Sequence, residues 1–358
     1  MKKHPWFPLP WHPSGQPDVI RFPKRQLRAV AALEYLATGL TAVAWAPLVA
    51  TAYATAPAGR GDAPPADFCA CAVGDETDPG RWREVLTLVR DLGLRRTLLR
   101  VPVWRRGELP RFRAWAEDLA AATGHPPLIA ILQERASVSH PGRWAADLHG
   151  IFRVLGPVAE AFQVPIAPNR TKWGCFHTGE ALDLLTTAHR VAARHPGVRL
   201  VGPSVIDFEP LPAARLLLNF RRFTVQAVTA QLYVDRRGGP HAKQYGWFDL
   251  ARKIRLQWAL AACSARVAHG APLWITEVNW PIVDTDEFSP AADDVCVDED
   301  TAAGHLLEYY RIAWATGLVQ RVYWWSLIHP GFGLVDPRGG SLRQRPAYHA
   351  LRKLLRGG

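Results

Sequence analysis

Carboxylate, amide and tryptophan side chains follow a series of short apolar runs in this sequence, at the point where each run ends. Glu277 and Asn279 close one such run, and Gln231 and Tyr233 close another. A sugar site needs this mixture, because indole faces stack on the C–H surfaces of a pyranose while amides and carboxylates hydrogen-bond its hydroxyl groups. The candidate sugar-binding residues are Arg100, Asn169, Arg170, Lys172, Trp173, Gln231, Tyr233, Asn279, Trp280, Trp324 and Trp325.

Strand-like and helix-like segments alternate from residue 67 onward and must position these side chains. The apolar runs predict eight strands, near 67–73, 97–103, 127–132, 161–167, 198–204, 225–233, 272–277 and 320–326. Amphipathic helices fit between them, for example over 81–92 and 301–316. Eight such units predict an α/β fold of the TIM-barrel type, in which functional residues gather at the carboxyl ends of the strands. A doubly wound sheet is the alternative, but no glycine-rich phosphate loop follows the first strand.

The composition describes a globular chain with a basic balance. The 358 residues are 48% hydrophobic and 21% charged, which excludes a disordered chain and a small disulfide scaffold. The net charge of +11 comes mainly from scattered arginines, since only 7 of the 43 basic residues are lysine. Because these residues neither cluster nor form a nucleic-acid motif, we expect no nucleic-acid partner. Affinity for an acidic polysaccharide stays open.

Histidines and cysteines give no sign of a metal or another cofactor. No H-x-x-x-H or H-E-x-x-H spacing occurs, and no H-x-H follows the first predicted strand. The five cysteines are an odd number, and Cys69 and Cys71 lie two apart in a predicted strand. We therefore expect buried thiols on one face of that strand, no metal site and no cofactor.

Residues 1–66 differ from the rest and predict a separate N-terminal extension before a barrel over 67–358. The basic residues Lys24, Arg25 and Arg28 precede residues 35–56, which carry no charge. This order resembles a signal anchor and favours a membrane-associated or periplasmic location over a cytoplasmic one. The alternative is one or two helices that pack on the barrel, because the run is rich in Ala and Thr and contains Pro47.

Two segments carry a resemblance to clan A glycoside hydrolases. One is the T-E-x-N-W run over 276–280, and the other is Y-W-W over 323–325 followed by G-F-G-L-V-D over 331–336. These enzymes are (β/α)8 barrels with one Glu at the end of strand 4 and another at the end of strand 7. The resemblance covers about residues 67–354. The whole chain also resembles bacterial glycosyl-hydrolase-like proteins linked with envelope polysaccharide genes.

The resemblance implies roles for several residues. Glu277 would be the nucleophile, or the base that activates a water, and a second carboxyl group would protonate the glycosidic oxygen. Tyr233 would orient Glu277, Asn169 would hydrogen-bond the sugar 2-hydroxyl, and a strand-8 tryptophan would form the floor of the sugar subsite. The structural alternative for Glu277 is an ion pair with Arg100 or Arg170 in the barrel mouth.

The sequence departs from the clan A pattern at the end of the fourth predicted strand. Arg170 follows Asn169 where the clan has its acid/base Glu, and a guanidinium cannot donate a proton because its pKa stays above about 12. One explanation is a carboxylate from another loop, for which the candidates are Glu134, Asp207 and Glu209. Another is that Arg170 and Lys172 bind an acidic sugar or a phosphate. The third is a barrel that has lost hydrolysis and binds glycan in a polysaccharide assembly system.

Overall fold

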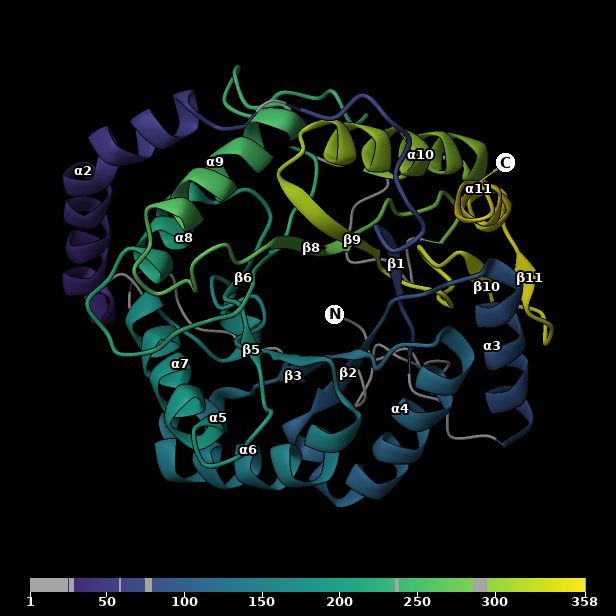
Figure 1. The fold of residues 1–358 in the computed structure, drawn as a ribbon, viewed down its shortest axis with the longest axis horizontal. Helices are drawn as coiled ribbons and strands as arrows, with labels where there is room; N and C mark the ends of the chain where they lie inside the picture. The colour runs from purple at the N-terminus through teal and green to yellow at the C-terminus, as the bar shows by residue number, and fades with distance from the viewer. Residues whose placement is uncertain are drawn as a thin grey trace.

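The structure is a computed structural model of the chain, shown in Figure 1. It describes residue 25 and residues 29–57, 59–74, 79–235, 238–285 and 295–357. Residues 1–24 and 26–28 of the predicted extension, including Lys24 and Arg28, lie outside the described residues.

Parallel strands form the centre of the molecule and curl into a barrel (Figure 1). In chain order they are β1 (Cys69–Ala72), β2 (Thr97–Pro102), β3 (Leu128–Leu132), β4 (Ala161–Gln163), β5 (Leu200–Val201), β6 (Ser204–Ile206), β7 (Val228–Gln231), β8 (Leu273–Val278) and β9 (Val319–Trp324). Their order in the sheet is β5-β4-β3-β2-β1-β9-β8-β7-β6. The predicted barrel is confirmed, and every predicted strand overlaps an observed one.

The predicted strand over 198–204 is two strands, β5 and β6, which lie at the two ends of the sheet order. The break falls at Gly202 and Pro203. Gly202 has φ +143°, and a Cβ there would lie 2.1 Å from the Val164 carbonyl oxygen, so only glycine fits. After the break, the Ser204 N–H donates to the Pro165 carbonyl oxygen at 3.2 Å, beside β4. The chain thus passes from the β4 side to the β7 side and closes the ring.

Helices surround the strands (Figure 1). They are α3 (Pro79–Leu92), α4 (Leu109–Thr123), α5 (Arg135–Ser139), α6 (Pro141–Leu155), α7 (Thr178–Ala192), α8 (Pro210–Leu217), α9 (Leu250–Ala262), α10 (Glu299–Ala315) and α11 (Pro346–Leu355). Short 3₁₀ turns lie at Val103–Glu108, Gly156–Val158 and Thr171–Trp173. The large apolar side chains pack between strands and helices, while small residues such as Ala70, Ala72 and Ala130 line the barrel interior. Cys69 and Cys71 are buried free thiols on the helix side of β1.

One further helix, α2 (Ala32–Ala54), lies outside this ring against α8 and α9 (Figure 1). In the described part of the chain it is the one helix that is long and apolar enough to cross a membrane. The Arg215 guanidinium of α8 donates to the Glu34 carboxylate at 2.7 Å, and Thr178 of α7 donates to the same oxygen at 3.0 Å. Residues 35–54 are therefore helical, and polar contacts fix the start of the helix to the barrel.

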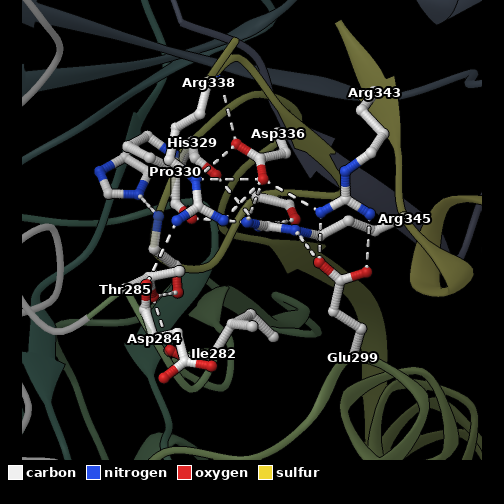
Figure 2. A network of polar contacts seen from close by, with 12 residues as sticks. Ile282, Asp284, Thr285, Glu299, His329, Pro330, Asp336, Arg338, Arg343 and Arg345 are labelled. Carbon is white, nitrogen blue, oxygen red and sulfur yellow. Dashed lines mark hydrogen bonds and ion pairs between the residues drawn. The ribbon is translucent and has the colours of Figure 1, made fainter.

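A polar network fixes the loop that follows β9 (Figure 2). The loop contains a small hairpin of β10 (Val335–Asp336) and β11 (Arg343–Gln344). Asp336 accepts from Arg338 at 2.8 Å and from Arg343 at 3.0 Å, and it lies 3.2 Å from the Arg345 guanidinium. Arg345 is buried and also donates to Glu299, at the start of α10, at 2.9 Å. These contacts hold the loop against the barrel next to the end of β9.

Candidate active site

The Glu277 carboxylate faces the barrel axis at the end of β8. A change of register between Ile275 and Val278 interrupts the alternation of the strand there. As a result both Thr276 and Glu277 point inward, whereas strict alternation would place them on opposite faces. Thr276 hydrogen-bonds Gln163 inside the barrel at 2.7 Å, and Glu277 lies one layer higher, 7% exposed.

Three side chains bind the Glu277 carboxylate, two from the end of the adjacent β7 and one from β2, which is not adjacent to β8 in the sheet. The Tyr233 hydroxyl donates to Oε1 at 2.5 Å, and Gln231 Nε2 donates to Oε2 at 2.7 Å. The Arg100 guanidinium of β2 donates to the same Oε2 and forms an ion pair. Two neutral donors and one cation thus fix the orientation of the carboxylate, and the Arg100 ion pair raised as an alternative from the sequence is present.

Arg100 is itself held between aromatic rings. Its guanidinium carbon lies 3.4 Å from the centroid of the Trp325 ring and 5.8 Å from that of Trp173. Its side chain is 11% exposed, so the cation is shielded from bulk water. Guanidinium groups stack well on indole faces, so β2, β4 and β9 jointly place the positive charge that faces Glu277.

A second charged cluster lies at the ends of β4 and β6. The Arg170 guanidinium donates to Asp207 at 2.7 Å and to Glu209, so both carboxylates share one cation. The Asn169 amide donates to Glu209 and to the Ile206 carbonyl oxygen, each at 2.9 Å. Asn169 also accepts from the Ile206 N–H at 3.0 Å, so its amide ties β4 to β6.

Lys172 lies between the two clusters. Burial lowers the pKa of its ammonium, while the charges of Glu277 and Asp207 oppose that shift and those of Arg100 and Arg170 add to it. The Lys172 ammonium therefore interacts electrostatically with both Glu277 and Asp207. The mouth holds three cations, Arg100, Arg170 and Lys172, and three carboxylates, Glu277, Asp207 and Glu209, so its formal charge is balanced.

Glu134 lies at the end of β3 but its carboxylate pairs with Arg143 of α6 at 2.7 Å. The partner is 42% exposed, which places this ion pair near the outer surface. The preceding residue, Gln133, is buried and donates to the Ile166 carbonyl oxygen at 2.6 Å. In this conformation Glu134 braces α6, while Glu277 has Arg100, Gln231 and Tyr233 as its hydrogen-bond partners.

The predicted tryptophans occupy two different environments. Trp280 and Trp324 are 1% and 2% exposed and stack on each other with centroids 6.0 Å apart. Asn279 donates to the Trp325 carbonyl oxygen at 2.9 Å and so joins β8 to β9. Trp325 is partly exposed and carries Arg100 on its ring, so it offers an indole surface at the mouth. Trp280, Trp324 and Asn279 support the site from behind.

Gln231 Oε1, Trp173 Nε1 and Trp324 Nε1 are buried and lack a hydrogen-bond partner among the described residues. Buried polar groups in folded proteins are nearly always satisfied by protein, water or ligand. Of the three, Gln231 Oε1 belongs to a side chain that binds Glu277 directly.

Lys253 of α9 is a buried contributor that the sequence analysis missed. Its Nζ donates to the carbonyl oxygen of Tyr233 at 3.3 Å, directly behind the side chain that orients Glu277. Burial lowers the pKa of Lys253 to about 8. The available signal was the spacing of Lys253 and Gln257, two polar residues four apart on the otherwise apolar buried face of α9.

The described residues contain no group of three or more His, Cys, Asp or Glu side chains that could hold a metal ion. The functional groups gathered at the mouth are carboxylates, a phenol and basic side chains. A fixed, largely buried carboxylate in an aromatic-lined mouth can act as a nucleophile or a base.

Comparisons with known proteins identify the fold. No protein-family model and no curated protein matches the sequence. The structure is similar to virulence factor SghA from Agrobacterium tumefaciens, with 12% identity and a TM-score of 0.58 over 82% of this chain and 97% of that one. SghA has also been solved with the substrate analogue salicin.

Two further solved structures are glycoside hydrolases by their titles. A GH51 arabinofuranosidase from Xanthomonas axonopodis pv. citri is 12% identical, with a TM-score of 0.54 over 82% of this chain and 73% of that one. A GH128 endo-β-1,3-glucanase from Amycolatopsis mediterranei, solved with laminaritriose, is 14% identical, with a TM-score of 0.50 over 80% of this chain and 99% of that one. The chain therefore has a (β/α)8-barrel fold similar to that of these solved structures.

Proposed function

We propose that this barrel cleaves O-glycosidic bonds, with Glu277 as the nucleophile. The observation that carries the proposal is the setting of Glu277: a bulge in β8 turns the carboxylate inward, and Tyr233, Gln231 and Arg100 fix its orientation. A carboxylate oriented in this way is prepared to attack an anomeric carbon, because little reorganisation is needed when the bond forms.

The first step would transfer the glycosyl group to Glu277. The carboxylate oxygen forms a bond to the anomeric carbon, and the bond from that carbon to the leaving oxygen breaks with its electron pair. In the second step water attacks the anomeric carbon and releases Glu277. If the second carboxyl group instead lies far enough away to leave room for a water, Glu277 would serve as the base in a single inverting step.

The second carboxyl group in this proposal comes from the cluster around Arg170, with Asp207 preferred. Asp207 is preferred because the Asn169 amide also binds Glu209, whereas Arg170 is the partner of Asp207 in this cluster. A proton donor must reach the leaving oxygen, whereas the Arg170 guanidinium already binds oxygens of both Asp207 and Glu209. Protonation of the leaving oxygen is therefore the weak step of the mechanism.

The same cluster favours a second candidate function, a glycan-binding barrel without catalysis. Arg170 holds Asp207 and Glu209 together, and the Asn169 amide binds Glu209. In that case both carboxylates fix the loops of the mouth, and Glu277 with Trp325 would bind sugar without cleaving it. A role in polysaccharide assembly would then follow from binding alone.

A leaving-group series separates these functions. The purified chain is incubated with aryl glycosides of several common sugars, whose phenols range from strongly to weakly acidic, and with the matching alkyl glycosides. A strongly acidic phenol departs without a proton, so its glycosides report on the nucleophile alone. Weakly acidic leaving groups report on nucleophile and acid together.

Each result of this series has one meaning. Cleavage throughout the series supports a complete hydrolase. Cleavage restricted to the most acidic phenols supports a nucleophile that lacks an effective acid. Sugar binding without cleavage of any substrate contradicts the hydrolase proposal and supports the binding barrel. If the whole series is cleaved, a comparison of Asp207→Asn with Glu209→Gln shows which carboxyl group protonates the leaving oxygen.

For the substrate we propose a bacterial surface polysaccharide, on the strength of the resemblance to proteins linked with envelope polysaccharide genes. An acidic polymer fits one feature of the mouth, the Lys172 ammonium between the two charged clusters. Arg170 is less suited to an acidic sugar than the sequence predicted, because its guanidinium already binds two carboxylates. Lys172→Met should therefore weaken binding of a uronic-acid oligomer more than that of its neutral counterpart.

A further inference from the structure

Helix α2 exposes an apolar surface that a water-soluble helix would not carry. In a surface helix one face is polar, but residues 35–54 carry no charge on any face. Only Thr38 and Val49 of α2 are buried, while Leu33 is 83% exposed and Val43 75%. A helix that is apolar on all sides is normally covered, so we expect a partner to cover the exposed side of α2.

Polar and main-chain contacts fix α2 to the barrel at both ends. Near its start Glu34 accepts from Arg215 at 2.7 Å and from Thr178 at 3.0 Å. Near its end the Tyr53 carbonyl oxygen accepts from Arg255 of α9 at 3.2 Å. In this position α2 cannot cross a bilayer, because α8 and α9 would enter the hydrocarbon with their arginines.

The apolar surface continues from α2 onto the neighbouring elements. Beside it runs a groove of about 340 Å³ lined by apolar side chains, among them Trp45 and Val49 of α2 and Leu211 and Leu218 of the α8 region. Leu211 is 52% exposed, Trp247 55% and Phe220 93%. Most of the exposed large apolar side chains of the described chain therefore lie on α2 or next to it.

Arginines precede or follow the elements of this surface in the chain, and one of them contacts it directly. Arg221 and Arg222 follow the exposed Phe220, and Arg25 is exposed before the start of α2. The Arg252 guanidinium lies 4.1 Å from the centroid of the Trp247 ring. Apolar and tryptophan side chains together with arginines match the acyl region and the anionic headgroups of a membrane surface.

We propose that this surface, formed by α2, Leu211 and Trp247, binds one leaflet of an anionic membrane with α2 parallel to the membrane plane. The barrel keeps its contacts to α2 and remains in water beside the lipid. The partner is the lipid layer itself, chosen because the surface combines exposed apolar side chains with these arginines. This proposal does not depend on whether the barrel cleaves glycosides.

The test uses the purified full-length chain and sedimentation with vesicles of phosphatidylcholine, with and without phosphatidylglycerol. We expect binding that increases with phosphatidylglycerol and decreases with salt. Leu36→Gln, Leu40→Gln and Val43→Gln combined should lower the bound fraction at least tenfold. Val43→Gln alone should also weaken binding, while the matched Val283→Gln, at an exposed valine far along the chain, should not. Unchanged thermal unfolding excludes misfolding of the variants.

A disulfide decides between a parallel and a spanning helix. The side-chain oxygens of Thr38 and Thr178 lie 3.5 Å apart, so Thr38→Cys with Thr178→Cys can lock α2 to the barrel. We expect the oxidised variant to bind vesicles as well as the reduced one. Loss of binding on oxidation, absence of vesicle binding by the wild-type chain, or a dimer in light scattering that Val43→Gln dissociates would each overturn the proposal.

Discussion

Glu277 and Asp336 are both buried carboxylates that face arginines, but their surroundings are built differently. Asp336 accepts from arginines of its own loop, and Arg345 lies 3.2 Å away (Figure 2). Burial opposes its charge, but hydrogen bonds from Arg338 and the nearby guanidiniums outweigh that effect and keep its pKa well below the ordinary value. Because several arginines surround it, Asp336 stays charged and fixes the loop that follows β9.

Glu277 has one cation and two neutral donors, and these come from different strands. Its position depends on strands from opposite sides of the barrel, and the Arg100 guanidinium forms an ion pair with it. A carboxylate with balanced neighbours keeps more of its reactivity than one surrounded by guanidiniums. From this difference we expect the Asp336 network to contribute to stability and, under the proposed function, the Glu277 network to contribute to catalysis.

The largest expected effect separates the two networks by activity. Glu277→Gln keeps the size of the side chain but removes the nucleophile, so cleavage of an activated aryl glycoside should decrease at least about a thousandfold. Sugar binding should remain. Steady-state kinetics and calorimetric titration measure the two quantities. A variant that still cleaves at the wild-type rate would mean that the reactive carboxylate lies elsewhere.

The next largest effect distinguishes the Asp336 network from the Glu277 network by the free energy of unfolding. Arg345→Met leaves Asp336 and Glu299 without a buried partner, so the free energy of unfolding should decrease by about 3–5 kcal/mol. Arg343→Met is the control, because Arg343 is 51% exposed and its loss should cost at most about 1 kcal/mol. Urea unfolding followed by tryptophan fluorescence measures both. Equal losses would refute the distinction between the two arginines.

A third prediction concerns the lysine behind the Glu277 network. Lys253 has a pKa of about 8 in the folded protein, below the 10.5 of an exposed lysine. Between pH 8 and pH 10.5, Lys253 carries a proton in the unfolded chain but not in the folded protein. The free energy of unfolding of the wild type should therefore increase by about 3 kcal/mol over this pH range, relative to that of Lys253→Met. Unfolding curves of both proteins from pH 7 to 10.5 test this. A constant difference would show that Lys253 keeps its proton when folded.

The smallest stability effect belongs to the cluster at β4 and β6. Arg170 is 34% exposed, so Arg170→Met should change the free energy of unfolding by no more than about 1 kcal/mol. Its loss frees the oxygens of Asp207 and Glu209 that it binds to contact the leaving group, so cleavage of glycosides with weakly acidic leaving groups should increase several-fold. The pH dependence of kcat/KM provides the readout. Decreased cleavage would assign Arg170 to the substrate instead.

Much of the fold could be predicted from the sequence, because each buried strand is a short apolar run followed by polar residues. The division of one predicted strand into β5 and β6 could not, since it depends on the contact between Gly202 and the Val164 carbonyl oxygen. The bulge in β8 that turns Glu277 inward depends in the same way on its pairing with β9. Such contacts join residues far apart in the sequence.

The site residues were likewise predictable where they depend on local sequence and not where they depend on tertiary contacts. Position at strand ends indicated Glu277, Gln231 and Tyr233, and the structure brings these three together. The orientation of Glu134 toward Arg143 required knowledge of how α6 packs. The stacking that buries Trp280 likewise depends on tertiary contacts that no local pattern encodes.

The most direct test of the central claim is covalent trapping of the nucleophile. The chain is treated with 2-deoxy-2-fluoroglycosides that carry a dinitrophenyl leaving group, across several sugars, and the protein is analysed by intact mass and peptide mapping. The fluorine slows release of the glycosyl group, and the leaving group needs no acid. The account predicts one added fluoroglycosyl group on Glu277 and none on the Glu277→Gln variant. A label on another carboxylate, or sugar binding without any label, would contradict it.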